Sequence, residues 1–245
     1  MAQDILPFGH EVAQVVDIAL EQLQLAGVKP IEWLALVYHR MGVPVLVTNF
    51  SYLVDDHDLN RASEILSGLG LPLSPPSRLL LRTRGDLHSK GRFYRVTRSE
   101  HPAAIQHLAI FPLSFSSLCL SDMEEKPPCH IAPSRCPRVL VPCRAVVYAS
   151  VLRMMRKYPR TDPVRGILMS DLSQLIRHDL YRLECGYVDP SDDEKWERLE
   201  IDHRIKEAAE EVNSWVWGEN GEWIRKALVE VVASGDVENL PCSCQ

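Results

Sequence analysis

Two groups of polar side chains in the first half of the chain have residue types that could do chemistry. The first is a run of three acids and a histidine: Asp55, Asp56, His57 and Asp58. Asp55 and Asp58 could bind a cationic substrate group such as guanidinium, while His57 could act as a general base oriented by Asp56. The same run is also typical of a solvated turn whose last acid caps the following helix.

The second group is Asn49 and Ser51, which lie in the apolar run just before those acids. They could act on a ligand if that strand borders a cleft, or they could be strand residues with outward polar side chains. Further along, Ser114, Ser116 and Ser117 could accept an acyl group if a histidine reached them. No G-x-S-x-G pattern supports that role, and turn or capping hydroxyls are the alternative.

Two more groups lie in the second half. His178 could act on a substrate that Asp179 and Tyr181 bind, because the three sit on one expected helix; an ordinary helix surface is the alternative. A basic run could meet the phosphates of a nucleic acid or nucleotide, or could be a solvated helix face. It consists of Arg153, Arg156, Lys157 and Arg160.

The seven cysteines do not predict a disulfide framework or a metal site. Their number is odd and the chain has 245 residues, so reduced thiols are expected. Cys129, Cys136 and Cys143 are seven residues apart, whereas zinc ligands usually come in short pairs such as C-x-x-C. We therefore expect no metal and no cofactor. Residues 242–245 fit a C-a-a-X pattern, but the preceding segment is acidic, which disfavours membrane anchoring.

The charge distribution limits the possible partners. The net charge is −6, whereas nucleic-acid-binding proteins are usually basic. Residues 101–189 carry 11 basic and 8 acidic groups, a net of +3, and residues 190–245 carry 6 and 14, a net of −8. No apolar run approaches the roughly 20 residues that a membrane span needs, and the N-terminal segment lacks the basic start of a secretory signal. A cytoplasmic protein without stable membrane association is expected.

Periodicity predicts a mixed first half and a helical second half. Helices are expected at 10–27, 31–40 and 59–68, and a strand at 43–50 continues as extended chain through 51–54. Strands at 78–83 and 91–97 around a polar loop indicate a hairpin, and 107–115 is a third apolar run. The proline-rich segment 121–142 is interpreted as a connection between domains at 1–120 and 143–245. The second domain should contain helices at 143–157, 167–184, 194–217 and 219–234.

Residues 41–73, MGVPVLVTNFSYLVDDHDLNRASEILSGLGLPL, resemble the core of a nucleotidyltransferase-like fold found in many fungal proteins. Active members hold magnesium with two alternating carboxylates on the second strand and a third on a later strand. Here Asn49 and Ser51 stand in that second-strand region, and the third position falls near His107 or Ala109. The resemblance thus implies an α/β nucleotidyltransferase-like mixed sheet followed by an all-helical part, without metal-dependent nucleotidyl transfer.

The chain is also similar, in size and in its lack of familiar motifs, to fungal arginine-containing cyclodipeptide synthases, which join aminoacyl groups taken from charged tRNA. That similarity implies a group-transfer enzyme of specialised metabolism, with aminoacyl-tRNA and a small molecule as partners. It predicts a deep cleft lined by Asn49, Ser51, residues 55–58 and part of 171–182. The alternative is a non-catalytic relative that binds a nucleotide or a protein, with a shallow or filled cleft and no paired acid and base.

Overall fold

A computed structural model describes residues 12–99, 101, 104–184, 191–218 and 221–242. The chain divides into an α/β unit, Met1–Arg40 with Val45–Cys143, and a helical unit, Met41–Pro44 with Arg144–Gln245. The predicted fold class, an α/β part followed by a helical part, is confirmed. The start of the first predicted helix and residues 243–245 of the C-a-a-X pattern lie outside the described residues.

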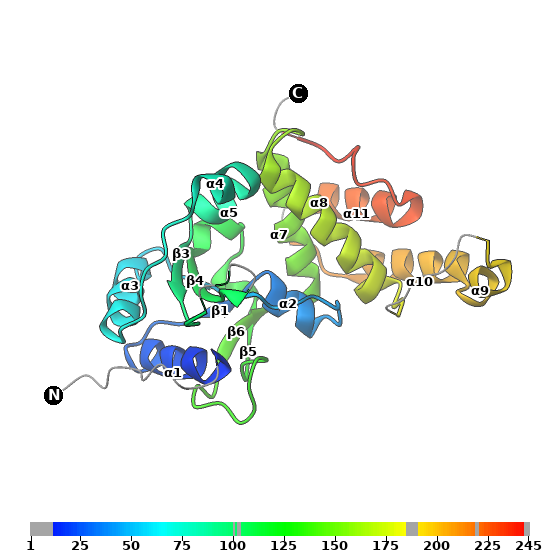
Figure 1. Ribbon diagram of the computed structural model, residues 1–245. Helices are drawn as coiled ribbons and strands as arrows, with labels where there is room; N and C mark the ends of the chain where they lie inside the picture. Colours follow the sequence, from blue (N-terminus) through cyan, green and yellow to red (C-terminus); the bar gives the residue numbers. More distant parts are fainter. Residues whose placement is uncertain (1–11, 100, 102–103, 185–190, 219–220, 243–245) are drawn as a thin grey trace. The chain divides into compact units, whose positions relative to one another are not determined.

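One mixed sheet of six strands organises the α/β unit (Figure 1). Its strands, in the spatial order β3-β4-β2-β1-β6-β5, are β1 (Ile31–Glu32), β2 (Asn49–Val54), β3 (Arg92–Arg95), β4 (His107–Pro112), β5 (Met123–Lys126) and β6 (Val139–Pro142). β2 is parallel to β4 and β1 is parallel to β6, while the other three neighbouring pairs are antiparallel. The inner strands β2 and β4 are almost continuously buried, as expected for parallel neighbours covered on both faces.

One face of this sheet carries the main hydrophobic core. Because side chains alternate along a strand, Phe50, Tyr52 and Val54 of β2 point to the same side. They pack in one buried cluster with residues of α1 (Val12–Leu25) and α3 (Leu59–Gly68). Both helices have apolar side chains at three- and four-residue spacing, so each presents one apolar stripe to the sheet. These two helices agree with their predicted positions.

The opposite face, called the polar face below, mixes aromatic and hydrogen-bonding side chains. The strand register places five of them on it: Asn49, Ser51, Phe93, Arg95 and His107. Two short helices border the strands: α5 (Asp86–Ser89) precedes β3, and α6 (Leu113–Ser116) follows β4. This is the face on which Asn49 and Ser51 could meet a ligand.

The predicted hairpin at 78–97 is wrong, because its first half is helix α4 (Arg78–Arg84). The side chain of Ser77 accepts a hydrogen bond from the backbone N–H of Leu80 at 3.2 Å, and Gly85 ends the helix with a φ of 49°. The run of leucine and arginine has high helix propensity and no strand-like alternation of polar and apolar residues. A capped start and a glycine end therefore outweigh the apolar character that suggested a strand.

The proline-rich segment 121–142 also differs from its interpretation as a connection. Its two ends are β5 and β6, which pair with each other at one edge of the sheet. The loop between them is fastened to the unit by two buried acids. Asp17 accepts the backbone N–H of Arg135 at 2.9 Å, and Glu32 accepts that of Cys129 at 3.1 Å.

Two other predicted elements have different boundaries in the structure. The expected strand at 43–50 is mostly irregular, and β2 begins only at Asn49. The expected helix at 31–40 divides into β1 and α2 (Ala35–Arg40), with Leu34 between them at a φ of 51°. A left-handed residue of this kind breaks a helix, so the helical periodicity of this stretch described only its second half.

The helical unit contains the predicted helices with adjusted ends. They are α7 (Arg144–Lys157), α8 (Pro163–Leu175) with a π-helical turn (Ile176–Leu180), α9 (Asp193–Arg198), α10 (Ile201–Ser214) and α11 (Glu222–Ser234). Asp162 caps α8 by accepting the N–H of Val164 at 2.8 Å, which explains the earlier start. None of the described helices is long and apolar enough to cross a membrane.

Candidate functional site

Asn49 and His107 form the centre of the polar face. They are register partners on the parallel strands β2 and β4, and Asn49 Oδ1 lies 3.2 Å from His107 Nδ1. Ser51, two residues along β2, is buried with 4% of its surface exposed and is the register partner of Ala109. The positions that the family resemblance singled out therefore meet in space, but they hold an amide, a hydroxyl and an imidazole.

A second histidine joins this group from α5. The ring of His88 stacks on Phe93 with 4.5 Å between centroids, and Phe93 meets the ring of His107 edge-on at 5.9 Å. His88 is only 8% exposed. Phe93 is thus the common neighbour of two imidazoles that stand nineteen positions apart in the sequence.

Both imidazoles are electrostatically disfavoured as cations. The pKa of His88 is lowered to about 4, mainly by burial and in addition by the nearby charges of Arg84 and His107. Burial and Arg95 likewise lower the pKa of His107. Both rings are therefore neutral at pH 7, each with one N–H and one lone pair.

One ring nitrogen of each histidine lacks a hydrogen-bond partner. Nδ1 of His88 and Nε2 of His107 are buried and find no partner within the described part of the chain. Buried polar nitrogens normally have one, so each marks unused hydrogen-bonding capacity on the polar face. Among the described residues, no three His, Cys, Asp or Glu side chains converge closely enough to hold a metal ion.

The acids at 55–58 lie at the other end of β2. Six strand residues at a rise of about 3.3 Å each place them on the order of 15–20 Å from Asn49. Asp56 accepts hydrogen bonds from the Ser114 backbone N–H at 3.0 Å and from its hydroxyl at 2.5 Å, and these bonds lower the pKa of Asp56. The carboxylate therefore ties the end of β2 to the start of α6.

The neighbours of Asp56 also have local roles. Asp55 accepts the backbone N–H of His57 at 3.0 Å, which forms a turn. Asp58 precedes α3, but its side chain makes no capping hydrogen bond, contrary to the capping interpretation. The structure thus separates the acids from Asn49 and Ser51, and the α/β unit does not bring the two predicted groups into one site.

In the helical unit, His178, Asp179 and Tyr181 each bind a different part of that unit. Asp179 accepts hydrogen bonds from Arg144 and from the hydroxyl of Tyr148, both at 3.0 Å. Burial raises the pKa of Asp179, and the Arg144 hydrogen bond opposes that shift.

The other two members also make hydrogen bonds within the helical unit, one local and one to α11. His178 Nδ1 donates to the carbonyl of Leu183 at 2.8 Å, and the Tyr181 hydroxyl donates to that of Val232 at 2.5 Å. Because the three side chains reach different partners, they form separate local and interhelical contacts rather than one converging constellation.

The predicted nucleic-acid-binding run lies at the end of α7 and just beyond it. Arg156, Lys157 and Arg160 are exposed and Arg153 is half-buried. The guanidinium of Arg156 lies 5.2 Å from the ring centroid of Trp223, a cation–π contact. Its role in binding phosphates stays a prediction.

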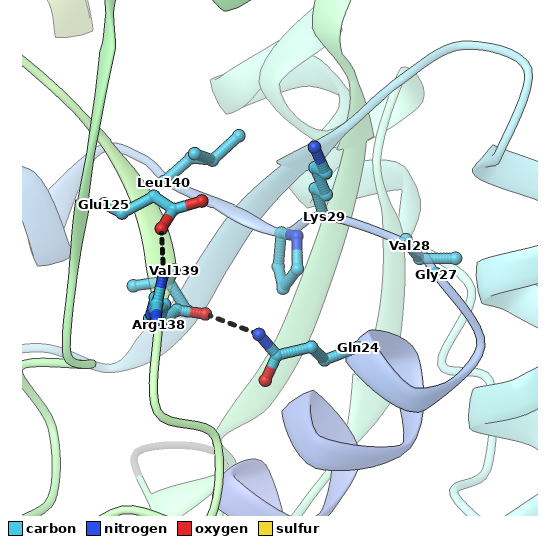
Figure 2. A pocket seen from close by; sticks show the side chains of 9 residues that line it. Gln24, Gly27, Val28, Lys29, Glu125, Arg138, Val139 and Leu140 are labelled. Carbon is cyan, nitrogen blue, oxygen red and sulfur yellow. Dashed lines mark hydrogen bonds and ion pairs between the residues drawn. The ribbon is translucent and has the colours of Figure 1, made fainter.

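A small cavity of about 130 Å³ lies elsewhere in the α/β unit, between the end of α1 and the β5–β6 hairpin (Figure 2). Arg138 forms an exposed ion pair with Glu125 at 2.8 Å there, and its carbonyl accepts from Gln24 at 3.4 Å. None of the predicted site residues lines this cavity, so the polar face is the stronger candidate.

Sequence reasoning missed His88 and Phe93. It placed His88 in a polar hairpin loop, and it interpreted 91–97 only as a strand. The one available signal was that a polar loop with a histidine precedes a strand that neighbours β4. Because α5 was not predicted, that signal could not be connected to His107.

Comparison with known proteins gives no relative: no family model matches the chain, and no curated protein or solved structure matches it either. The fold and the site therefore define the class on their own. The chain is a two-unit protein with an α/β sheet whose polar face carries Asn49 and two neutral histidines.

Proposed function

We propose that the α/β unit binds a phosphate-bearing ligand of the nucleotide class on its polar face. The observation that carries the proposal is the pair of buried ring nitrogens, His88 Nδ1 and His107 Nε2, without a partner among the described residues. An imidazole N–H donates well to a phosphate oxygen. Both rings pack against Phe93, so an anionic group bound beside Phe93 could accept from either ring.

The charges around the two rings favour an anion. Besides burial, Arg84 and His107 lower the pKa of His88 and Arg95 lowers that of His107, and no carboxylate contributes to either shift. An anion placed here would stabilise the imidazolium forms and offset part of the depression. Asn49 Oδ1, which faces His107 Nδ1, would accept from an Nδ1–H and leave Nε2 as an acceptor; with the amide turned so that its N–H faces Nδ1, His107 carries its proton on Nε2 and presents a donor to the ligand.

Binding is a better match to this geometry than group transfer. Asn49 and Ser51 stand where the resembling family needs carboxylates, and neither can act as a strong base. The Ser114 hydroxyl donates to Asp56, but the lowered pKa of Asp56 makes that carboxylate a weak base. Amide formation from aminoacyl-tRNA therefore stays a prediction from the sequence.

Calorimetric titration of the full chain with AMP, ADP and ATP, with and without magnesium, tests the proposal. We expect saturable binding that weakens at least tenfold in His107→Gln and in His88→Phe, which keeps a ring against Phe93. His203→Gln, an exposed histidine of α10, is the matched control and should bind as the parent does. Binding that is absent, or equal in all three variants while they remain folded, would contradict the proposal.

A further inference from the structure

A concentrated basic segment adjoins the polar face. Residues 78–98 contain seven arginines and lysines and one acid, Asp86, a net charge of +6 within a chain of net −6. The segment comprises α4, α5 and β3. Residues 1–100 as a whole are nearly neutral, so the charge of that longer segment does not reveal this local excess of positive charge.

Four cations of this segment are exposed and form no ion pair with any described residue. We call them the α4–α5 basic surface: Arg78, Arg82, Arg84 and Lys90. The chain has 33 acids for 27 arginines and lysines, so partners are abundant, yet these four remain unpaired. Free guanidinium groups are suited to the planar, bidentate recognition of phosphate.

Helix α4 has the exposed side chains expected of a docking surface. None of its residues is buried, and Leu79, Leu80 and Leu81 are 69%, 36% and 39% exposed. A seven-residue helix is normally stabilised by packing its apolar side chains, which α4 does not do within the chain. Arg78 and Arg82 are one helical turn apart, about 6 Å along the axis, so they can contact successive phosphates of one strand.

We infer that the α4–α5 basic surface binds the phosphate backbone of a single-stranded nucleic acid that continues from the polar face. This inference rests on the proposed function, since it makes the ligand of the polar face one nucleotide of a longer strand. Arg84 joins the two surfaces, because it belongs to α4 and is an electrostatic neighbour of His88. Its position makes the ligand-binding area continuous.

The exposed leucines favour a single strand over a duplex. The exposed leucines lie between the arginines, where they can cover apolar faces of bases that are unstacked, whereas a duplex hides those faces. The acidic segment 190–245 would repel phosphate, whereas residues 78–98 carry a net charge of +6. The local +6 segment therefore determines where a strand can bind.

The test is the salt dependence of binding to a fluorescein-labelled 12-nucleotide RNA of mixed sequence, measured by anisotropy with the full chain. Four phosphate contacts predict a slope of log K against log [KCl] of about −3. Arg78→Gln/Arg82→Gln should reduce that slope by about 1.4 and weaken binding roughly 20-fold at about 0.1 M KCl. Both residues are exposed, so the variant should fold.

Two control variants locate the surface. Arg225→Gln removes a half-buried arginine that pairs with Glu222, and Arg156→Gln/Lys157→Gln removes part of the basic run on α7. Both should leave the slope unchanged. A slope that changes in the α7 variant but not in the α4 variant would overturn the inference, and so would tighter binding of a duplex of the same sequence.

The outcomes also separate this inference from the proposed function. RNA binding that is lost in Arg78→Gln/Arg82→Gln while ATP binding persists would support both. If the parent binds ATP but not RNA, the inferred binding of a single-stranded nucleic acid is refuted, and the proposed nucleotide binding is not. Failure to bind either probe would refute both.

Discussion

Asn49 and His107, 58 residues apart in sequence, meet at 3.2 Å across the parallel pair β2–β4. This contact couples the orientation of the Asn49 amide to the tautomer of His107. An amide can present either its oxygen or its N–H to the ring, so the pair can adopt both tautomers. A carboxylate at the same place could only accept, and that difference gives the first prediction.

Asn49→Asp should raise the pKa of His107. The new carboxylate would accept a hydrogen bond from Nδ1–H and stabilise the imidazolium, which opposes the depression caused by burial and Arg95. NMR titration of the imidazole protons measures the shift, which should exceed one pH unit. The control is Asn60→Asp on α3, where Asn60 accepts from Arg92 at 2.7 Å. A His107 pKa that is equal in parent and Asn49→Asp would contradict the contact.

Removal of the Glu32 charge should strongly destabilise the α/β unit. Glu32 is fully buried and accepts from Arg40 at 2.9 Å and from the backbone of Cys129 at 3.1 Å. Glu32→Gln would leave the Arg40 guanidinium without its counter-charge, at a cost of about 3–5 kcal/mol in the free energy of unfolding. Urea unfolding measures it. Glu125→Gln, in an exposed ion pair with Arg138, should change little, and equal effects in the two variants would refute the burial argument.

The long, periodic elements of this fold were predictable from local sequence. Helices α1, α3 and α7 repeat apolar residues at helical spacing over ten or more positions, so each pattern defines a buried face. Short elements escaped prediction. Residues 78–83 read as a strand until Ser77 and Gly85 are taken as helix ends, and β5, with the sequence MEEK, has no apolar alternation at all.

The candidate site was predictable only in part. Asn49 and Ser51 were selected because a family pattern pointed to their strand, whereas His107 was noted only as lying near the family's third carboxylate position and was not predicted as a site residue. His88 was not recognised from the sequence, because its position depends on α5 and on a stacking contact with Phe93. Closeness in sequence also gave a wrong expectation. Asp56 follows Ser51 by five residues, yet it lies beyond the end of β2 that is opposite to Asn49.

Gly91→Ala should destabilise the α/β unit by crowding two aromatic rings of the polar face. A Cβ at Gly91 would lie 2.4 Å from the ring of Phe111 and 2.9 Å from that of Phe93, so one ring must move. Overpacking of this kind costs about 1–3 kcal/mol in the free energy of unfolding. Gly166→Ala is the matched control, because nothing lies within 4 Å of its Cβ position in α8 and alanine favours a helix. Thermal unfolding should show a loss in the first variant and none in the second.

Cys129 should resist alkylation in the folded protein. Burial and the negative charge of Glu32 raise the pKa of its thiol to about 12, so only about one molecule in ten thousand carries the thiolate at about pH 8. Exposed Cys119 should react with iodoacetamide under the same conditions. Peptide mass spectrometry after a short reaction measures both, and urea should remove the difference. Fast native labelling of Cys129 would show that the loop after β5 is open.

The stability of the chain should fall with decreasing pH because of His88. Its pKa is about 4 when folded, against an ordinary 6.5, so the unfolded chain takes up the proton first. The contribution of neutral His88 to the free energy of unfolding is therefore fully present above pH 6.5. It declines as the pH falls from 6.5 towards 4, where the loss is about 3 kcal/mol. Urea unfolding at pH 7.5, 5.5 and 4.5 measures the decline. His88→Phe keeps a ring against Phe93 but cannot titrate, so its stability should depend less on pH. If the parent and His88→Phe lose stability in parallel over this range, His88 is not a neutral buried histidine.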